Sequence, residues 1–439
     1  MPEPPPLTLN LSKRKLRLFK FALLFVSLII GLLIAEVALR LIGYTYPLFY
    51  TTDIVRGYAL QPGMSGWYRK EGESYVRING DGQRDREHAK AKPVGTLRIA
   101  VLGDSYAEAL QVPLEDAFPV VMEGRLQSCP AFKGKLIEVL NFGVSGYGTA
   151  QELLTLREKV WDYAPDIVLL AVTTNNDITD NLRAFKRTEE IPYFVYRDDG
   201  QLTLDDSFLR SRTFQLRHSA LNRAGRWIRD RLRVIQAFHQ GHYALKNYLA
   251  SRRTPAPAAP PPIAQPVGGI NLQATDAPPQ RDAAVATAAA AAVVSDEVGI
   301  DNLVYREPAD ANWREAWRVT EGLLTLMRDE VRGHGAKFIV VTLSNGIQVH
   351  PQPAARAAFL RRVGADDIFY PDTRLRLLGE RENFPVITLA PPLQQYAEQH
   401  AVFLHGFGRD LGNGHWNSSG HRVAGELLAQ KLCEVVGRH

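Results

Sequence analysis

The sequence contains little cysteine and shows no metal-binding pattern. It has two cysteines in 439 residues, which excludes a disulfide-rich scaffold and a site ligated by several thiolates. The spacings of its histidines and aspartates match no metal-ligand motif. The glycine-rich stretch Gly143–Gly148 lacks both the Lys-Ser/Thr ending of a phosphate-binding loop and an acidic residue about 20 positions later. The sequence therefore predicts neither a metal nor another cofactor.

An excess of charge of one sign is also missing from most of the chain. The formal net charge is +5. The first 20 residues account for +4 of it, because five basic residues there are accompanied by a single acidic one, Glu3. The rest of the chain is nearly neutral, so its composition predicts no nucleic-acid partner. Hydrophobic residues at 45% and charged residues at 23% are typical of a globular protein and exclude disorder of the whole chain.

One stretch of the sequence is apolar enough to suggest a membrane span. Phe21 to Ala35 carries no charge, but at about 1.5 Å per residue it is too short for a hydrocarbon layer of roughly 30 Å. Extension to Gly43 makes it long enough and includes Glu36 and Arg40, which can pair along one helix face. The basic residues before it predict a cytoplasmic tail at 1–20, and residues 21–43 are then a single-pass anchor. This topology places the remaining chain outside the cytoplasm, in the periplasm if the span lies in the inner membrane of a Gram-negative bacterium.

Two other interpretations of this segment stay open. It resembles a signal peptide in length and position, although Gly43-Tyr44-Thr45 is a poor cleavage site. A helix buried in a soluble core has a similar composition, but the flanking charges argue against it.

Beyond the anchor, short apolar runs alternate with helical patterns. Residues 44–96, with many Gly, Pro and charged positions, predict an irregular lead-in. The runs that follow are apolar almost throughout, which is typical of strands buried on both faces of a parallel sheet. We therefore expect an α/β fold with a doubly wound, flavodoxin-like sheet of five parallel strands. The predicted strands are Leu97–Leu102, Ile137–Phe142, Ile167–Val172, Phe338–Leu343 and Val386–Leu389.

An insertion at 188–310 separates the third strand from the fourth, so that the α/β domain consists of residues 97–187 and 311–439. Within the insertion, the Pro- and Ala-rich stretch 254–294 cannot bury enough apolar surface to fold and predicts a disordered loop. Arg210–Arg253 contains ten Arg and one Lys against the single acid Asp230, interleaved with apolar residues. This pattern predicts a basic amphipathic helix or helix pair. It fits contact with anionic lipid headgroups or an acidic polysaccharide as well as it fits a solvated surface helix.

Small or polar residues follow three of the predicted strands. Ser105 follows the first strand in GDS, Gly146 the second in GVSGYG, and Asn176 the third in TNND. The carboxyl ends of the strands in an open α/β sheet face one crevice, so these three residues are expected to lie close together. His415, in a glycine-rich loop before the last predicted helix, is the candidate base for the Ser105 hydroxyl.

These motifs resemble those of the SGNH (GDSL-type) hydrolase family. VLGDSYAEAL is similar to the family's first block, NFGVSGYGTAQEL to the second, TTNNDITDN to the third and GHWNSSGH to the fifth. The resemblance covers residues 97–433 apart from the insertion. It implies an SGNH hydrolase fold with Ser105 as nucleophile and His415 as base. The implied oxyanion hole consists of the backbone N–H groups of Ser105 and Gly146 and the side-chain amide of Asn176.

The sequence departs from the family pattern at two places. Thr174 stands where the third block usually has Gly. The fifth block usually has an Asp two or three residues before the His, where this chain has Asn413 and Gly412. Asp410, Asn413 or a backbone carbonyl are therefore the candidates for the group that orients His415.

The resemblance implies attack of Ser105 on an ester carbonyl and release of the acyl group to water or to a sugar hydroxyl. We expect a serine esterase that hydrolyses O-acyl esters of a cell-envelope glycan or a lipid. One alternative is an O-acyltransferase that modifies an exported polysaccharide, working with envelope polysaccharide machinery. The other, favoured by the missing Asp, is a catalytically silent glycan-binding or assembly protein.

The two cysteines allow one structural expectation. In a sheet of flavodoxin-like order, the helix after the first strand and the last helix cover the same face, and Cys129 and Cys433 stand at the ends of these helices. An oxidising compartment would permit a disulfide between them. Two buried free thiols are the alternative.

Overall fold

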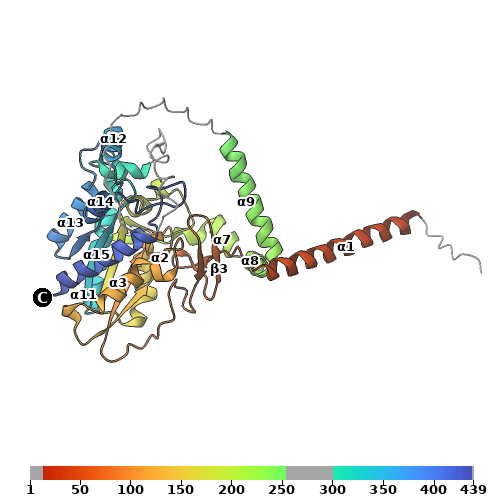
Figure 1. The fold of residues 1–439 in the computed structure, drawn as a ribbon, viewed down its shortest axis with the longest axis horizontal. Coiled ribbons are helices and arrows are strands. Elements are labelled where there is room, and N and C mark those ends of the chain that lie inside the picture. The colour runs from red at the N-terminus through yellow and green to blue at the C-terminus, as the bar shows by residue number, and fades with distance from the viewer. Residues whose placement is uncertain (1–12, 254–299, 438–439) are drawn as a thin grey trace, which may run out of the picture. The chain divides into compact units, whose positions relative to one another are not determined.

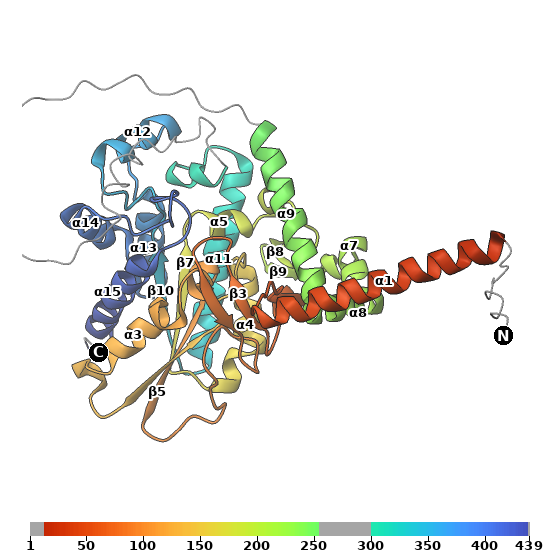
Figure 2. The same ribbon diagram turned by 45° about the vertical axis from the view of Figure 1, so that its right-hand side comes forward.

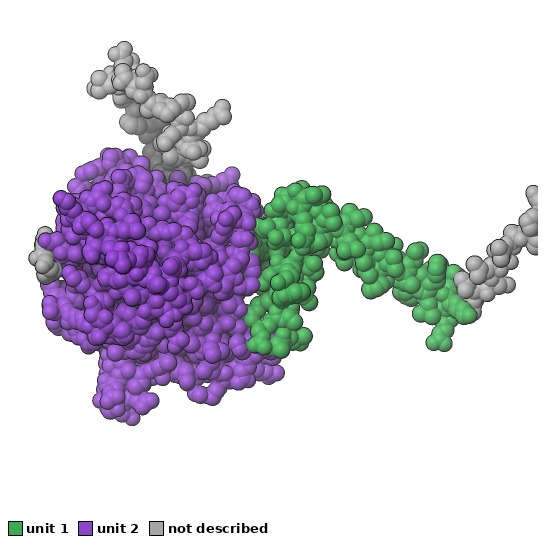
Figure 3. Space-filling view, turned by 90° about the horizontal axis from the view of Figure 1, so that it is seen from below, with its two compact units in different colours: residues 1–48, 220–255 green, residues 49–219, 256–439 purple. Residues whose placement is uncertain are grey.

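The computed structural model describes residues 13–253 and 300–437. The predicted disordered loop at 254–294 lies outside these residues. Two compact units are distinguished in Figure 3. The smaller contains residues 13–48 and 220–253, and the larger contains residues 49–219 and 300–437.

A five-stranded parallel sheet forms the centre of the larger unit (Figure 1). Its strand order is β11-β10-β7-β5-β6, which confirms the predicted flavodoxin-like order. Ile99 of β5 pairs with Val139 of β6 on one side and with Ile167 of β7 on the other. The strands are β5 (Thr96–Gly103), β6 (Leu136–Asn141), β7 (Ile167–Thr173), β10 (Lys337–Leu343) and β11 (Val386–Thr388). Each agrees within one residue with its sequence prediction, because strands buried on both faces give uninterrupted apolar runs.

Helices cover both faces of this sheet and bury a separate apolar core on each. One core is closed by α4 (Thr149–Glu158), α11 (Ala311–Gly333), α12 (Pro353–Val363) and α13 (Tyr370–Glu382). The other is closed by α3 (Phe118–Leu126), α14 (Ala390–His400) and α15 (Ser418–Gly437), and Figure 2 shows α3 and α15 side by side. Short helices at the loops are α2 (Ser105–Glu108), η1 (Leu114–Asp116), η2 (Pro130–Phe132), η3 (Val160–Tyr163), α5 (Asn176–Asp180), α6 (Arg183–Lys186) and η5 (Ile300–Tyr305).

A disulfide joins the end of helix α3 to helix α15. Cys129 follows α3 and Cys433 lies in α15, and their Cα atoms are 5.9 Å apart. The bond links residues 304 positions apart in sequence. By closing a long loop, it therefore lowers the conformational entropy of the unfolded chain.

Reduction of this disulfide is expected to lower the free energy of unfolding by about 2–5 kcal/mol. Urea unfolding of the full chain in detergent, with and without a reductant, measures this difference. The double variant Cys129→Ser/Cys433→Ser should be as unstable as the reduced parent and insensitive to the reductant. A parent whose unfolding midpoint is the same in both conditions would show that the bond does not contribute.

The lead-in before the sheet is more regular than the sequence indicates. It forms two antiparallel hairpins, β1 (Tyr50–Asp53) with β2 (Gly57–Leu60), and β3 (Ser65–Tyr68) with β4 (Ser74–Arg77). Leu60, Val76 and Ile78 are buried in a small core together with Val144 and Tyr147 of the loop after β6. Strands of four residues are too short to give a sustained alternating pattern, so the prediction of an irregular segment was wrong.

The insertion contributes to both units. In the larger unit it forms a hairpin of β8 (Tyr193–Tyr196) and β9 (Leu202–Asp205), followed by η4 (Ser207–Arg210) and α7 (Arg212–His218). In the smaller unit it forms α8 (Ala220–Arg231) and α9 (Arg233–Arg253). The N-terminal helix α1 belongs to the same unit.

Helix α1 spans Lys13–Leu41 and therefore begins before the predicted anchor at 21–43. Its mean hydropathy reaches 2.7 over an 18-residue window, and none of that window is buried. The helix is long and apolar enough to cross a membrane, a property that a signal sequence near an N-terminus shares.

Candidate active site

Ser105 is the first residue of the short helix α2, directly after strand β5. The fully buried Asp104 carboxylate fixes this turn by accepting hydrogen bonds from the backbone N–H of Tyr106 at 3.0 Å and from the Thr173 hydroxyl at 3.0 Å. Because Thr173 ends the neighbouring strand β7, Asp104 ties together the ends of two strands. The nucleophile candidate thus stands on a turn that two strands hold in place.

His415 lies in the loop before α15 and reaches Ser105 across the carboxyl edge of the sheet. Its Nε2 is 2.8 Å from the Ser105 Oγ. The backbone carbonyl of His415 accepts a hydrogen bond from the Gly406 N–H at 2.9 Å, and the Tyr106 ring lies 5.1 Å from the imidazole ring. The sequence-predicted pair of serine and histidine therefore has the distance that proton transfer requires.

Glu71, between strands β3 and β4, holds the other side of His415. One carboxylate oxygen is 2.5 Å from Nδ1 of His415, and the other accepts a hydrogen bond from the His415 backbone N–H at 2.7 Å. Gly414, at φ +71°, permits this approach, because a Cβ there would lie 2.2 Å from a Glu71 oxygen. Glu71, His415 and Ser105 form a continuous acid, base and nucleophile array of the kind found in hydrolase triads.

The array shifts the pKa of both ionisable partners. Burial lowers the pKa of His415, but the hydrogen bond and charge of Glu71 outweigh it, and the pKa lies above the ordinary value of 6.5. Burial likewise raises the pKa of Glu71, but its bonds to His415 outweigh that effect and lower it below 4.5. The charged Glu71 carboxylate therefore favours the protonated form of the His415 imidazole.

Neither fifth-block candidate for the orienting group occupies that position. Asp410 and Asn413 are both exposed, and Asn413 donates its backbone N–H to the Asp410 carbonyl at 3.2 Å. The group bonded to Nδ1 of His415 is Glu71 instead. Gly412 and Gly414, on either side of Asn413, both have positive φ.

The three predicted oxyanion donors lie at neighbouring loops. The Asn176 side-chain amide donates one hydrogen bond to Asp104 at 2.8 Å, which fixes its orientation and leaves its second N–H for another acceptor. Gly146 has φ +76°, and a Cβ there would lie 2.8 Å from the Tyr58 hydroxyl oxygen. Gly146 is therefore required both by its backbone conformation and by the close packing of Tyr58.

Glu108, at the end of α2, positions the Gly146 loop. Its carboxylate accepts hydrogen bonds from the Ser145 backbone N–H at 2.9 Å and from the Tyr50 hydroxyl at 2.8 Å. Burial raises the pKa of Glu108 to about 7, although these bonds favour the charged form. The helix that begins with Ser105 therefore also carries the group that holds the loop of Gly146.

The third-block departure from the family pattern is accommodated without loss of a hydrogen bond. Thr174 is fully buried, and its hydroxyl oxygen accepts a hydrogen bond from the Asn345 side chain at 3.2 Å.

Ser105, Gly146, Asn176 and His415 are all partly exposed, so solvent and substrate can reach them.

Solved structures of esterases are among the structures that align with this chain. The acetyl xylan esterase AlAXEase aligns with a TM-score of 0.33 and 11% identity over 77% of this chain and 100% of that chain. Axe2, an acetylxylan esterase from Geobacillus stearothermophilus, aligns with a TM-score of 0.34 and 12% identity over 78% of this chain and 96% of that chain. A G-D-S-L family protein from Desulfitobacterium hafniense DCB-2 aligns with a TM-score of 0.30 and 10% identity over 76% of this chain and 99% of that chain. No family model and no curated protein sequence matches the chain.

The fold assignment rests on the chain's own strand order, because these alignment scores are low. The order β11-β10-β7-β5-β6 is flavodoxin-like, and the matched blocks stand at the carboxyl ends of β5, β6 and β7. The flavodoxin-like α/β fold predicted from the sequence is confirmed by this strand order.

One residue of the site was missed because no local signal marks it. Glu71 lies in the lead-in, away from the strand ends where an SGNH fold places its chemistry. The one indication was negative, since the fifth block lacks its usual Asp and a carboxylate from elsewhere could replace it.

Within the described ranges 13–253 and 300–437, the structure contains no group of three or more His, Cys, Asp or Glu residues able to hold a metal ion.

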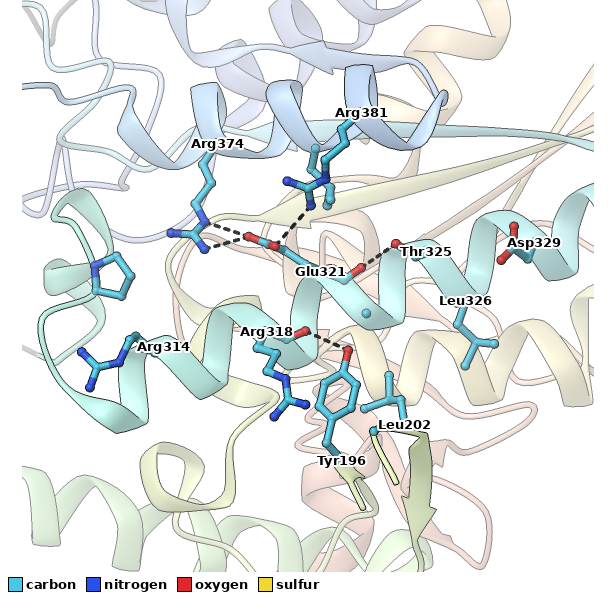
Figure 4. A pocket seen from close by; sticks show the side chains of 14 residues that line it. Tyr196, Leu202, Arg314, Arg318, Glu321, Thr325, Leu326, Asp329, Arg374 and Arg381 are labelled. Carbon is cyan, nitrogen blue, oxygen red and sulfur yellow. Dashed lines mark hydrogen bonds and ion pairs between the residues drawn. The ribbon is translucent and has the colours of Figure 1, made fainter. Parts of the chain in front are cut away.

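A hollow of about 690 Å³ lies along helix α11 (Figure 4). The Glu321 carboxylate bonds Arg374 at 2.8 Å and Arg381 at 3.6 Å, and the Arg318 guanidinium lies 3.8 Å from the centre of the Tyr196 ring. Its lining contains no Ser, Cys or His. Three of the arginines that line the hollow, Arg318, Arg374 and Arg381, are thus engaged by neighbouring side chains.

The pKa of His415 predicts how activity depends on pH. The imidazole must be neutral to accept the Ser105 proton, so kcat/KM is expected to rise with pH through an apparent pKa above 6.5 and to be lost as the pH falls. Glu71→Gln removes the charge that stabilises the imidazolium and should move this pKa downward. Profiles of kcat/KM for the parent and this variant check both points. An acid limb that the substitution leaves in place would assign the titration to another group.

Proposed function

We propose that this protein is a membrane-anchored serine esterase of SGNH type that hydrolyses O-acyl esters of a cell-envelope glycan or lipid outside the cytoplasm. The observation that carries the proposal is the hydrogen-bonded array in which Glu71 orients His415 and His415 contacts the Ser105 hydroxyl. The array supplies a base and a nucleophile in contact, which is the requirement for acyl transfer through a serine.

The reaction proceeds in two halves. His415 takes the proton of the Ser105 hydroxyl as the oxygen attacks the ester carbonyl, and the oxyanion is stabilised by the N–H groups of Ser105, Gly146 and Asn176. His415 then gives the proton to the leaving alcohol, which breaks the ester bond and leaves the acyl group on Ser105. A water molecule, deprotonated by His415, attacks this acyl group, and the proton returns to Ser105 as the carboxylic acid leaves.

Two features support the extracytoplasmic location. Helix α1 is long and apolar enough to anchor the chain, and its basic N-terminal residues favour a cytoplasmic N-terminus in the inner membrane. The disulfide between Cys129 and Cys433 fits an oxidising compartment such as the periplasm, because disulfides persist there.

The glutamate also weakens the case for a catalytically silent protein. That alternative depended on the absence of an acid partner for His415, and Glu71 fills this position. We therefore favour an active enzyme.

The direct test is hydrolysis of p-nitrophenyl acetate by the full chain in detergent, compared with the Ser105→Ala variant. The proposal expects turnover by the parent and none above background by the variant. Addition of an oligosaccharide acceptor then distinguishes hydrolysis from transfer: acyl-oligosaccharide as the main product would make the protein an O-acyltransferase. Equal rates for the parent and the variant would refute the proposed activity.

A further inference from the structure

Two charged residues near the C-terminal end of α1, Glu36 and Arg40, bind the junction between α8 and α9. Glu36 accepts a hydrogen bond from the Val234 backbone N–H at 2.9 Å, and Arg40 donates to the Arg231 carbonyl at 2.6 Å. Arg40 and Glu36 also bond each other at 2.8 Å. Glu36 thus caps the start of α9 and Arg40 the end of α8, where backbone groups have no partner within their own helix. The charges of α1 therefore attach a helix pair to its C-terminal end.

Helix α9 leaves this attachment at a steep angle to α1, as Figures 1 and 2 both show. Gln236 accepts a hydrogen bond from the Tyr46 backbone N–H at 2.8 Å, and Gln240 accepts one from the Tyr44 hydroxyl. Tyr44 and Tyr46 follow the last turn of α1. If α1 crosses a bilayer, as proposed above, α9 runs along its surface, and its glutamine side faces away from the lipid.

The opposite side of α9 carries an exposed apolar stripe. Ile235, Phe238, Leu245 and Leu249 are 36%, 78%, 55% and 49% exposed, and their spacing of three, seven and four residues places them on one helix face. Gln236 and Gln240 lie on the other face by the same spacing rule. The stripe therefore lies opposite the side of α9 that binds the segment following α1, and so on the side toward the bilayer if α1 crosses it.

Helix α8 also exposes its apolar residues. Leu221, Trp227 and Ile228 are 84%, 57% and 43% exposed, whereas the side chains of Arg229 and Asp230 are only 21% and 7% exposed. A surface helix of a soluble protein shows the reverse arrangement, with its apolar face buried. An apolar face turned outward is typical of a helix that lies in a membrane interface.

The charge of the helix pair selects the kind of bilayer. Residues 220–246 contain a single acid, Asp230, and six basic residues, which are Arg223, Arg226, Arg229, Arg231, Arg233 and Lys246. The Arg231 guanidinium lies 4.0 Å from the centre of the Trp227 ring, and tryptophan is enriched at membrane interfaces. Each basic residue near an anionic membrane surface contributes to binding. An acidic polysaccharide would match the charge but would leave the apolar residues in water.

We propose that α8 and α9 form a platform that rests on a bilayer containing anionic phospholipid, with the apolar residues in the headgroup boundary and the arginines at the phosphates. This inference rests on the proposed membrane span of α1. The platform would hold the exit point of α1 at a fixed depth and give α9 a defined orientation along the membrane surface.

Depth-dependent quenching of a label on α9 tests the platform. Because Cys129 and Cys433 are joined in a disulfide, Leu245→Cys provides a single free thiol for a bimane label in the full chain. The adjacent Ala244 is also exposed but lies on another side of the helix, so Ala244→Cys is the matched control. Both are reconstituted in nanodiscs of phosphatidylcholine and phosphatidylglycerol that carry a doxyl group near the headgroup.

The platform predicts at least threefold stronger quenching at position 245 than at position 244. Arg223→Gln/Arg226→Gln, or discs of phosphatidylcholine alone, should reduce it, whereas a soluble acidic polysaccharide should not. Equal weak quenching at both positions in discs that retain the chain would overturn the platform and leave the membrane span intact. Failure of the chain to co-purify with discs would overturn both. Disulfide cross-linking of unlabelled Leu245→Cys between two copies would instead assign the stripe to self-association and reject the lipid contact.

Discussion

Ser105→Ala is expected to lower kcat for p-nitrophenyl acetate by about 10⁶-fold, the loss seen when the serine of a Ser-His array is removed. The reason is that Nε2 of His415 lies 2.8 Å from the Ser105 Oγ. In the described part of the chain, no other hydroxyl is in contact with this nitrogen. Initial rates of the purified full-length variant, measured against a blank without enzyme, give the size of the loss.

Ser128→Ala is the matched control for this experiment. Ser128 is an exposed serine outside the site, so its removal should leave kcat within twofold of the parent. A Ser105→Ala variant with more than about a tenth of parental activity would remove Ser105 from the role of nucleophile.

Glu71→Gln is expected to lower kcat by about 10³–10⁴-fold, by analogy with loss of the triad acid in serine proteases. Glutamine keeps the size of the side chain but carries no charge to stabilise the imidazolium. Its amide can also favour the wrong tautomer of His415. Steady-state kinetics should show the loss in kcat with little change in KM, because Glu71 contacts His415 and not the substrate.

The exposed residues of the fifth block provide the controls for Glu71. Asp410→Asn and Asn413→Ala should each retain kcat within about threefold, since neither side chain reaches His415. A large loss in Asp410→Asn together with an unaffected Glu71→Gln would show that the loop rearranges and that Asp410 is the orienting acid in the working enzyme.

The sequence was sufficient to predict the sheet, for physical reasons. Strands buried on both faces leave uninterrupted apolar runs, and the strand order then brings the ends of β5, β6 and β7 to one edge. Ser105, Asn176 and Gly146 follow these ends by two, three and five residues, and His415 precedes the last helix, so their positions depend on local features of the chain.

Glu71 and the hairpins of the lead-in could not be predicted in the same way. Glu71 acts over 344 positions of sequence separation, and its approach depends on the positive φ of Gly414, a feature of the backbone that composition does not reveal. The pairing of Glu36 and Arg40 with each other was predicted, but their caps on α8 and α9 depend on residues nearly 200 positions away. Contacts of this range are set by tertiary packing and leave no periodic signal.

Covalent labelling by a fluorophosphonate tests the central claim most directly. The reagent phosphonylates a serine hydroxyl only when a neighbouring base activates it, and mass spectrometry of the digested chain identifies the modified residue. The array predicts one modification, on the peptide that contains Ser105, and labelling that is at least 100-fold slower in His415→Ala. An unmodified Ser105 in the parent, or labelling at the same rate in both proteins, would contradict activation of Ser105 by His415.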